Sequence, residues 1–166
     1  MNYQYVYETQ IGPVTMLSDD RYLLGLWLKN QRYFGADYNL DAALTKLTVP
    51  IEAAINWLDD YFAGNHPDVK MVPLNPVTTS FRKQVFNELL MVPYGQTITY
   101  AAIAEAIQND ASKSKNLARA VGGAVGHNPI ALIIPCHRVI GSDGQMTGYA
   151  GGIPNKRFLL NFEQST

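Results

Sequence analysis

The sequence predicts an α/β protein with a small N-terminal sheet of meandering strands and one helix, followed by a mostly helical C-terminal half. Three observations predict this class. Apolar and polar residues alternate near the N-terminus, as in strands. Apolar residues recur at helical spacing after residue 79. Three prolines between residues 65 and 78 separate the two patterns and divide the chain into domains 1–76 and 77–166.

The N-terminal half begins with a predicted strand meander over residues 2–29. Tyrosines alternate with other residues between positions 3 and 7, and Gly-Pro and Ser-Asp-Asp turn signals follow. Residues 30–47 show little pattern, and we expect a loop there with a short helix near 40–46. A helix over 50–63 completes this half, because a proline suits its first turn and a glycine follows its end.

The C-terminal half contains the pattern of a helix-turn-helix. A first helix begins at Thr79 or Ser80, either of which is a good N-cap. Thr99 is expected to cap a short helix over 100–107, and the polar stretch 109–116 separates it from a helix at 117–125. Two short helices joined by a polar turn are typical of DNA-binding modules, although such pairs are also common in small α/β proteins. Glycine-rich turns and a last helix beginning at a proline end the chain.

The charges are unevenly divided although the net charge is −1. Residues 1–79 hold five Lys and Arg against nine Asp and Glu, whereas residues 80–166 hold eight against five. The second half, which includes the pair Lys156-Arg157, can therefore meet phosphate groups. An asymmetry of this size also arises by chance, so the charge distribution alone does not decide whether the protein binds a polyanion.

Several classes of protein are excluded by composition. There is no apolar run of about 18 residues, so no membrane span is expected. The first residues lack the basic end and apolar stretch of a signal peptide. A single cysteine excludes an internal disulfide and a zinc site of several cysteines. We therefore expect a cytoplasmic protein with no bound metal.

Cys136 is the one candidate nucleophile. It ends an apolar run after Pro135 and is followed by His137 and Arg138, and a basic or proton-accepting neighbour raises the thiolate fraction of a cysteine. Neighbouring side chains of an extended chain point to opposite faces, so we expect His137 to reach the sulfur through a water molecule. An inert buried cysteine is the alternative.

An acidic residue is needed to hold the other nitrogen of a neutral His137. Glu163 and Asp143 are the acidic candidates downstream. For Glu163, which lies near the chain end, a solvated side chain is the alternative.

Residues 118–126 form an unusual helix of small residues with Arg119 near its start. Each glycine inside a helix costs about 0.5–1 kcal/mol relative to alanine, so close approach to another group has to compensate. One interpretation is tight packing within the protein. The other is a narrow face pressed into a DNA groove, with Arg119 replacing a base that has left the stack.

These segments resemble the O6-alkylguanine-DNA alkyltransferases, also called methylated-DNA–protein-cysteine methyltransferases. The resemblance is carried by Ile134-Pro135-Cys136-His137-Arg138-Val139-Ile140, Ala118-Arg119-Ala120-Val121-Gly122, Asn128-Pro129, Tyr149-Ala150-Gly151-Gly152 and Glu163. It is dense over residues 80–163, whereas the N-terminal half fits only in length and element order. It implies a ribonuclease H-like N-terminal domain and a C-terminal domain with a helix-turn-helix and a cysteine active site.

The resemblance implies DNA repair by a single-turnover methyltransferase that flips the damaged base. Cys136 would accept the alkyl group of O6-alkylguanine irreversibly, and His137 would take the thiol proton through water. Glu163 would orient and polarise His137, and Asn128 would hold the turn before the cysteine. No metal or organic cofactor is required, and activity on O4-alkylthymine is left open.

The resemblance also implies how a monomer would contact double-stranded DNA without any membrane partner. Tyr100 would donate to N3 of the flipped guanine, and Arg119 would take its place in the stack. Backbone groups of Cys136, Val139 and Ala150 would contact the base. The remaining implied residues are Val125 and Tyr149 in the pocket, and Ala118, Gly122, Gly123, Lys113 and Lys115 on the DNA.

Two departures and two rival functions accompany this interpretation. Tyr100 and Arg119 are separated by about five residues more than in a compact helix-turn-helix, and Ala150 stands where some relatives have serine. The rivals are a lesion sensor of the same fold that does no chemistry and a cysteine hydrolase or redox protein unrelated to DNA. The presence of Cys136 argues against the first, and the lack of a base facing it across a cleft argues against the second.

Overall fold

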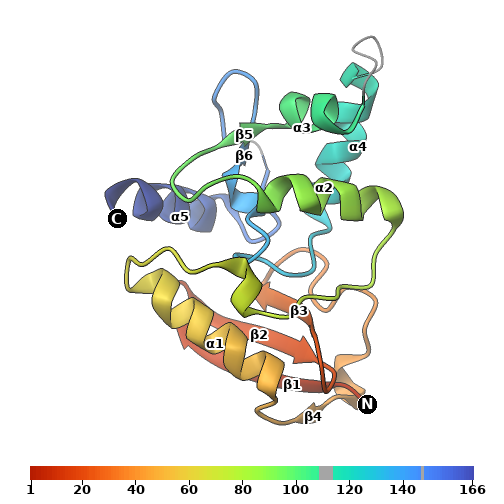
Figure 1. Cartoon of the computed structure of the whole chain (residues 1–166), viewed down its shortest axis with the longest axis vertical. Helices are drawn as coiled ribbons and strands as arrows, with labels where there is room; N and C mark the ends of the chain where they lie inside the picture. Colours follow the sequence, from red (N-terminus) through yellow and green to blue (C-terminus); the bar gives the residue numbers. More distant parts are fainter. Residues whose placement is uncertain (109–113, 147) are drawn as a thin grey trace. The chain divides into compact units, whose positions relative to one another are not determined.

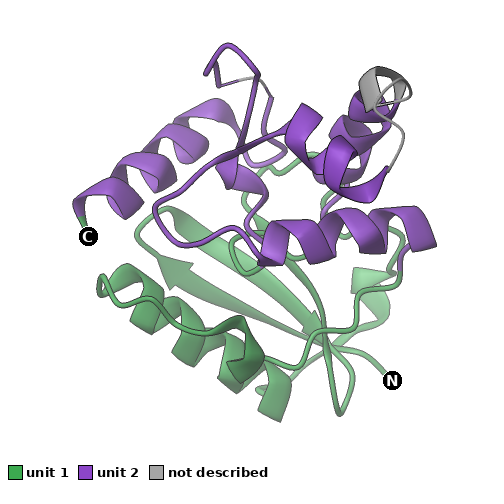
Figure 2. Ribbon diagram, turned by 45° about the horizontal axis from the view of Figure 1, so that its top comes forward, with its two compact units in different colours: residues 1–77, 129–133, 166 green, residues 78–128, 134–165 purple. Residues whose placement is uncertain are grey.

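The computed structural model describes residues 1–108, 114–146 and 148–166, except for the side chains of 114–116. Two compact units divide the chain (Figure 2). Unit 1 comprises Met1–Val77, Pro129–Ile133 and Thr166, and unit 2 comprises Thr78–Asn128 and Ile134–Ser165. That 1–76 and 77–166 fold as independent domains stays a prediction. None of the described helices is both long and apolar enough to cross a membrane.

Unit 1 is built on a four-stranded sheet in the order β3-β2-β1-β4 (Figure 1). Its strands are β1 (Tyr3–Thr9), β2 (Gly12–Ser18), β3 (Leu23–Leu28) and β4 (Leu44–Thr45). The predicted meander is confirmed, since β1, β2 and β3 pair in antiparallel register. β4 pairs in parallel with β1 and was not predicted, because a strand of two residues has no detectable period. The expected helix near 40–46 is a single 3₁₀ turn, Leu40–Ala42.

Helix α1 (Val49–Phe62) packs on the sheet of unit 1 (Figure 1), and the predicted helix is confirmed. The Thr48 hydroxyl accepts the N–H of Ile51 and so caps the first turn. Gly64 follows with a φ of +86°, the left-handed conformation that glycine adopts at helix ends. The buried face of α1 includes Ile51, Ala54 and Leu58, which are fully covered.

In strand β3 the buried ring of Trp27 packs over Gly25, where a side chain would otherwise be. A Cβ atom built on Gly25 would lie 2.0 Å from the Trp27 ring. We expect Gly25→Ala to destabilise the protein by about 1–3 kcal/mol, because the ring cannot move without repacking the core around Leu17 and Leu24. Urea unfolding measures this. Gly123→Ala, where no described atom lies within 4 Å, is the matched control, and equal stability of the two variants would contradict this prediction.

Unit 2 begins with three helices that pack against one another (Figure 1). They are α2 (Ser80–Leu90), α3 (Tyr100–Ile107) and α4 (Ser114–Gly126). Thr79 caps α2 and Thr99 caps α3, each through its hydroxyl, so both predicted starts are confirmed. α4 begins three residues before the predicted helix, and residues 109–113 of the polar stretch lie outside the described residues.

A short parallel pair of strands and a last helix complete unit 2. Strand β5 (Ile98–Thr99) pairs with β6 (Val139–Ile140), and helix α5 (Ile153–Ser165) follows. The buried residues of α5 are Lys156, Leu159 and Glu163, whereas Phe158 is exposed and stacks on Phe162. The final helix of the sequence prediction is confirmed, but its buried face carries two charged side chains.

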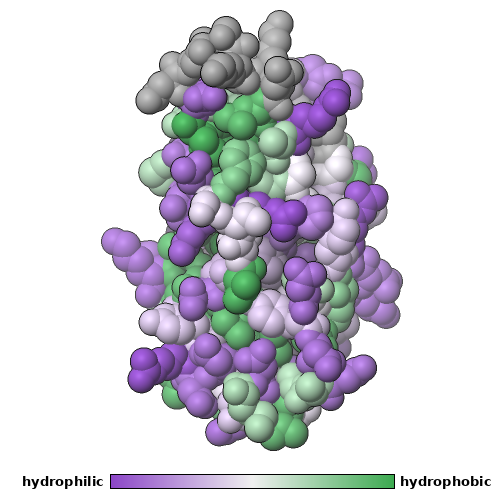
Figure 3. Space-filling model, turned by 90° about the vertical axis from the view of Figure 1, so that its right-hand side faces the viewer, coloured by the Kyte–Doolittle hydropathy of each residue, from purple (hydrophilic) through white to green (hydrophobic). Residues whose placement is uncertain are grey.

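The surface is mixed in character. On the face shown in Figure 3, hydrophobic side chains lie in small patches between polar ones over the residues that the structure describes. Exposed apolar residues such as Val6, Leu44 and Val49 belong to unit 1.

Candidate active site

Cys136 lies at the start of a tight turn. Pro135 has φ −82° and ψ 65°, and the N–H of Cys136 donates to the carbonyl of Ile134 at 2.8 Å, which is an inverse γ-turn. Residues Cys136–Arg138 then form one 3₁₀ turn. The expectation of an extended chain at this point was therefore wrong. The side chains of Cys136 and His137 point in different directions because successive residues of a 3₁₀ turn are rotated about its axis, and not because they alternate along a strand.

Asn128 fixes the turn before the cysteine. Its side-chain N–H donates to the carbonyl of Ile134 at 2.8 Å, so this carbonyl accepts both the Asn128 amide and the Cys136 N–H. Asn128 is buried and also interacts with the thiol of Cys136. One side chain thus links the end of α4 to the position of the sulfur.

His137 and Glu163 form a buried pair. Nε2 of His137 lies 2.6 Å from Oε2 of Glu163, and both side chains are excluded from solvent. An ionised carboxylate only accepts hydrogen bonds, so Nε2 carries the proton and donates it. Nδ1 of His137 is buried and has no hydrogen-bond partner among the described residues. In the neutral ring this nitrogen is a proton acceptor.

Glu163 is held by more than histidine. Arg138 donates to it from Nε at 2.8 Å and from Nη2 at 3.2 Å, and the N–H of Gly95 donates at 3.1 Å. Burial by itself would raise the pKa of Glu163, but the hydrogen bonds and charges of His137 and Arg138 lower it far below its usual range. The carboxylate is therefore ionised at any physiological pH.

The thiol of Cys136 lies in a buried environment with opposing influences. Burial raises its pKa, whereas Asn128, the positive charge of Lys156 and the Tyr149 hydroxyl lower it in part. The Tyr149 hydroxyl lies near the sulfur without a regular hydrogen bond. Burial and Cys136 raise the pKa of Tyr149 well above its usual value, so it stays a neutral O–H. The resting cysteine is therefore a thiol rather than a free thiolate.

Two cations of the basic C-terminal half are buried in the site. Sequence reasoning placed Arg138 next to the thiol but not on Glu163, and it missed Lys156. Lys156 is fully buried and donates to the carbonyls of Val139 and Gly148, so it is not part of a phosphate-binding surface. Arg138 is also buried, on Glu163. A signal existed for Lys156, because it lies seven residues before Glu163 and so shares its helix face.

The strand pair brings the start of α3 beside the cysteine turn. Ile98 pairs with Val139 and Thr99 with Ile140, so Tyr100, the next residue, is adjacent to the segment that leaves Cys136. This pairing joins the helix-turn-helix to the candidate active site within unit 2.

The other predicted pocket residues lie on three elements of unit 2. Tyr100 is half-buried, and a Cβ on Gly122 of α4 would be in ordinary contact with its ring at 3.9 Å. Val125 of α4 is buried, and Tyr149 and Ala150 lie half-buried in the turn before α5.

The predicted DNA-contacting residues lie on α4. Arg119 and Gly123 are exposed and one turn apart, and Ala118 is half-buried beside them. Lys113 and the side chain of Lys115 lie outside the described residues.

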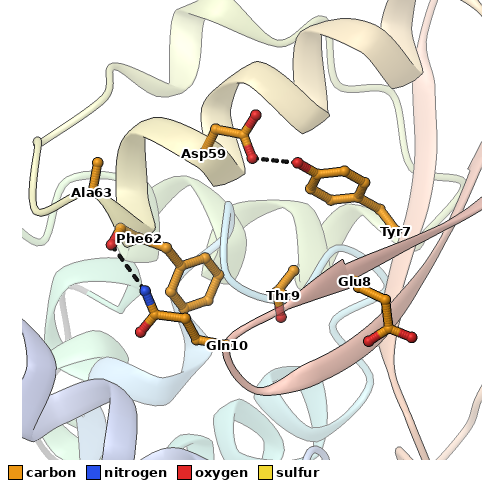
Figure 4. Close-up of a pocket in the computed structure, with 7 residues that line it drawn as sticks. All are labelled: Tyr7, Glu8, Thr9, Gln10, Asp59, Phe62 and Ala63. Atoms are coloured by element: carbon orange, nitrogen blue, oxygen red, sulfur yellow. Dashed lines mark hydrogen bonds between the residues drawn. The ribbon is translucent and has the colours of Figure 1, made fainter.

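Unit 1 contains a pocket of its own (Figure 4). Its walls come from the end of β1, the following turn and the end of α1. The Tyr7 hydroxyl donates to Asp59 at 2.5 Å, and the Gln10 amide donates to the carbonyl of Phe62 at 3.2 Å. None of the predicted site residues lines it.

Comparison with known sequences identifies a related family. Residues 80–165 match the domain described as 6-O-methylguanine DNA methyltransferase, DNA binding domain. A methylated-DNA–protein-cysteine methyltransferase of Mycobacterium tuberculosis is 40% identical over 161 residues, which cover 95% of this chain and 90% of that protein. The protein of the same name from Methanosarcina acetivorans is 36% identical, with 98% and 99% covered.

Solved structures agree with these sequences. A crystal structure of Mycobacterium tuberculosis OGT in complex with DNA superposes with a TM-score of 0.83 at 38% identity, covering 98% of this chain and 93% of that one. An O6-methylguanine DNA methyltransferase from Methanococcus jannaschii gives a TM-score of 0.66 at 25% identity, with 98% and 94% covered.

The packed helices α3 and α4, together with a buried cysteine next to a histidine that pairs with glutamate, define an α/β DNA-binding protein with a candidate nucleophilic thiol. The match extends over nearly the whole chain in sequence and in fold. The chain belongs to the methylated-DNA–protein-cysteine methyltransferase family, and the resemblance seen in the sequence is confirmed.

Proposed function

We propose that this protein repairs double-stranded DNA by moving the alkyl group of O6-alkylguanine onto the sulfur of Cys136. One observation carries the proposal: the residue directly after the chain's single cysteine, His137, forms a buried hydrogen-bonded pair with Glu163. In the reaction the S–C bond forms as the bond between the alkyl carbon and O6 breaks. The thioether product has no electrophilic carbonyl for water to attack, so the protein is consumed after one turnover.

His137 is the proposed acceptor of the thiol proton. Its Nε2–H is donated to Glu163, which leaves Nδ1 as the basic atom, and one water molecule bridges Nδ1 and the Cys136 thiol. Because burial raises the pKa of Cys136, the thiolate forms as the substrate arrives and not before. The charge of Lys156 and the Asn128 amide then stabilise the sulfur anion.

The flipped guanine is proposed to bind between α3, α4 and the turn before α5. Tyr100 donates to N3 and the N–H of Ala150 meets O6, so charge that appears on the leaving base is received by donors already in place. The carbonyls of Cys136 and Val139 accept the guanine amino group. The Val139 carbonyl already accepts Lys156 Nζ, and its second lone pair is the one assigned to the base. Val125 and Tyr149 complete the walls.

Helix α4 is the proposed DNA-facing helix. The glycines of α4 were explained either by packing within the protein or by contact with DNA. Apart from its chain neighbours and the backbone of its own helix, no described heavy atom lies within 4 Å of a Cβ built on Gly123. Packing within the protein therefore gives no reason for that glycine, which supports contact with a partner. Arg119 on the same face fills the vacated place in the base stack, beside Ala118 and Gly122. Lys113 and Lys115 are proposed phosphate contacts.

Gly123→Ala tests this face of the helix. We expect the variant to be more stable by about 0.5–1 kcal/mol, because alanine is the better helix former and meets no neighbour. We also expect at least several-fold weaker DNA binding, because the added methyl group keeps the helix from the groove. Thermal unfolding and fluorescence anisotropy measure the two effects. Undiminished DNA affinity would remove Gly123 from the interface.

DNA affinity is expected to depend on salt and little on sequence. Lesions occur in any context, so most contacts go to phosphates. With three or so phosphate contacts from exposed cations such as Lys83, Arg119 and Arg157, log K should fall against log salt with a slope of roughly −3. Anisotropy titrations between low and high salt measure the slope. A slope near zero would contradict binding through this basic half.

Intact-protein mass spectrometry tests the proposed function. After incubation with a duplex that contains O6-methylguanine, we expect a single adduct of about 14 Da, no more than one per protein, that maps to Cys136. A lesion sensor would bind the duplex and show no adduct. A hydrolase would release product well beyond one equivalent. Either of these results would overturn the proposal. Duplexes with O4-methylthymine or larger O6-alkyl groups define the substrate range.

We further propose that the protein works as a monomer in the cytoplasm. A thiol that must stay reduced to react suits a reducing compartment, and the site residues all belong to unit 2 of one chain. Size-exclusion chromatography with light scattering checks the monomer.

A further inference from the structure

Three side chains form a buried charge cluster: His137, Arg138 and Glu163. Arg138 places Nε on one oxygen of Glu163 and Nη2 on the other, and His137 Nε2 shares the second oxygen. All three residues are at most 7% exposed. The carboxylate is therefore contacted by two groups that are each able to carry a positive charge.

A carboxylate removed from water needs one compensating positive charge beside it. The guanidinium of Arg138 is always charged, whereas the imidazole of His137 is charged only when protonated. Arg138 and Glu163 alone therefore bring the cluster to zero net charge with a neutral histidine. A protonated His137 would leave one buried positive charge in excess.

Arg138 is fixed independently of the carboxylate. Its Nη1 donates to the carbonyl of Val92 at 2.9 Å, and its guanidinium lies 5.6 Å from the centre of the Tyr94 ring. Both contacts come from the segment between α2 and β5. The guanidinium thus stays beside Glu163 whatever the charge of His137.

We propose that Arg138 is a positioning residue that supplies the permanent countercharge of Glu163, and so keeps His137 neutral and able to accept the proton of Cys136. This rests on the proposed function above. Without Arg138, the lowest-energy way to compensate Glu163 is to protonate His137, and a protonated imidazole cannot act as a base.

The other charged and titratable groups around His137 act consistently with this role. Burial lowers the pKa of His137, Glu163 raises it in part, and the charges of Arg138 and Lys156 lower it again. Lys156 comes from α5 and also interacts with Cys136, and Tyr149 lies next to the sulfur. Of the two cations, Arg138 is the one that binds Glu163 directly.

NMR titration of the histidine ring nitrogens tests the inference without any alkylated substrate. We expect Arg138→Met to raise the pKa of His137 by about one unit or more, and Arg138→Lys, which keeps the charge, to raise it by less than half as much. The double variant R138M/E163Q removes both charges, so the pKa of His137 should fall back. Lys83→Met removes an exposed cation from α2 and should leave it unchanged.

The pH dependence of methyl transfer gives the second measurement. Its acid limb should move to higher pH in Arg138→Met by the same shift that NMR finds for His137, a change that a purely structural role would not produce. An unchanged His137 pKa in Arg138→Met would overturn the inference.

The wild-type protein remains decisive if that variant does not fold. In the wild-type protein the same NMR measurement should show a neutral His137 at pH 7 with its proton on Nε2. A doubly protonated ring would overturn the inference. If methyl transfer were absent while His137 behaved as expected, the proposed function would fail and the charge assignment would stand.

Discussion

Cys136→Ala is expected to abolish methyl transfer completely and to leave DNA binding intact. Cys136 is the single cysteine of the chain, so no other thiol can accept the group. The side chain is buried and small, so its loss should cost no more than about 1 kcal/mol of stability. Mass spectrometry measures the transfer, and anisotropy with an O6-methylguanine duplex measures the binding.

Two controls make this result specific. Cys136→Ser keeps a polar side chain of similar size and should also fail to transfer, because a serine hydroxyl is a far weaker nucleophile at neutral pH. Lys70→Met, which removes an exposed cation of unit 1, should transfer at the wild-type rate. Methylation of the alanine variant at one defined site would show that another residue is the acceptor.

Glu163→Gln is expected to slow transfer by about 10²–10⁴-fold and to lower the free energy of unfolding by about 3 kcal/mol at pH 7. An amide can donate to Nε2 of His137, which would move the ring proton to Nδ1 and remove the proposed base. The same change leaves the buried guanidinium of Arg138 without its carboxylate. Single-turnover kinetics and urea unfolding measure the two effects.

The pH dependence of stability separates the carboxylate from the histidine. The pKa of Glu163 is lower in the folded protein than its ordinary value of 4.5, so the unfolded chain takes up the proton first. Its contribution is complete above about 4.5 and is lost as the pH falls further. The stability difference between wild type and Glu163→Gln should therefore shrink below that pH. A difference that stays constant down to pH 3 would contradict the assigned ion pair.

His137 contributes in a separate window with the same sign. Its pKa is lower in the folded protein than its ordinary value of 6.5, so protonation of the unfolded chain begins to cost stability as the pH falls below 6.5. This loss should persist in Glu163→Gln, whose His137 pKa is lower still. The loss due to His137 begins below 6.5 and the loss due to Glu163 begins below about 4.5, so one urea series across pH distinguishes them by where each begins.

Local features of the chain were predictable because their causes lie within a few residues. Thr79 and Thr99 begin helices through their own hydroxyls, and Gly64 follows the end of α1 with the left-handed φ that glycine permits. The chemistry of the site was also local, since Cys136 and His137 are neighbours. From the residues alone Glu163 was one of two downstream acidic candidates, with Asp143, and the family resemblance singled it out.

Features that depend on distant partners were not predictable in the same way. β4 exists because two residues meet β1, and the turn at Cys136 exists because Ile134 accepts hydrogen bonds from Asn128 and Cys136. In the sequence Lys156 counted toward a phosphate-binding surface and Arg138 was a basic neighbour of the thiol, whereas in the structure both are buried and Arg138 binds Glu163. A charge count registers the type of a residue, whereas burial depends on what the fold places around it.

The sequence by itself determined the two-part α/β architecture, the starts of the helices and the reactive pair Cys136-His137, because capping, periodicity and adjacency are properties of short segments. Only the tertiary structure decided how that pair is controlled. It joins Glu163, Arg138 and Gly95 from separate elements around one carboxylate, and it faces Lys156 toward the sulfur. Charge states inside a protein are set by burial and by partners remote in sequence, and both exist only after the chain has folded.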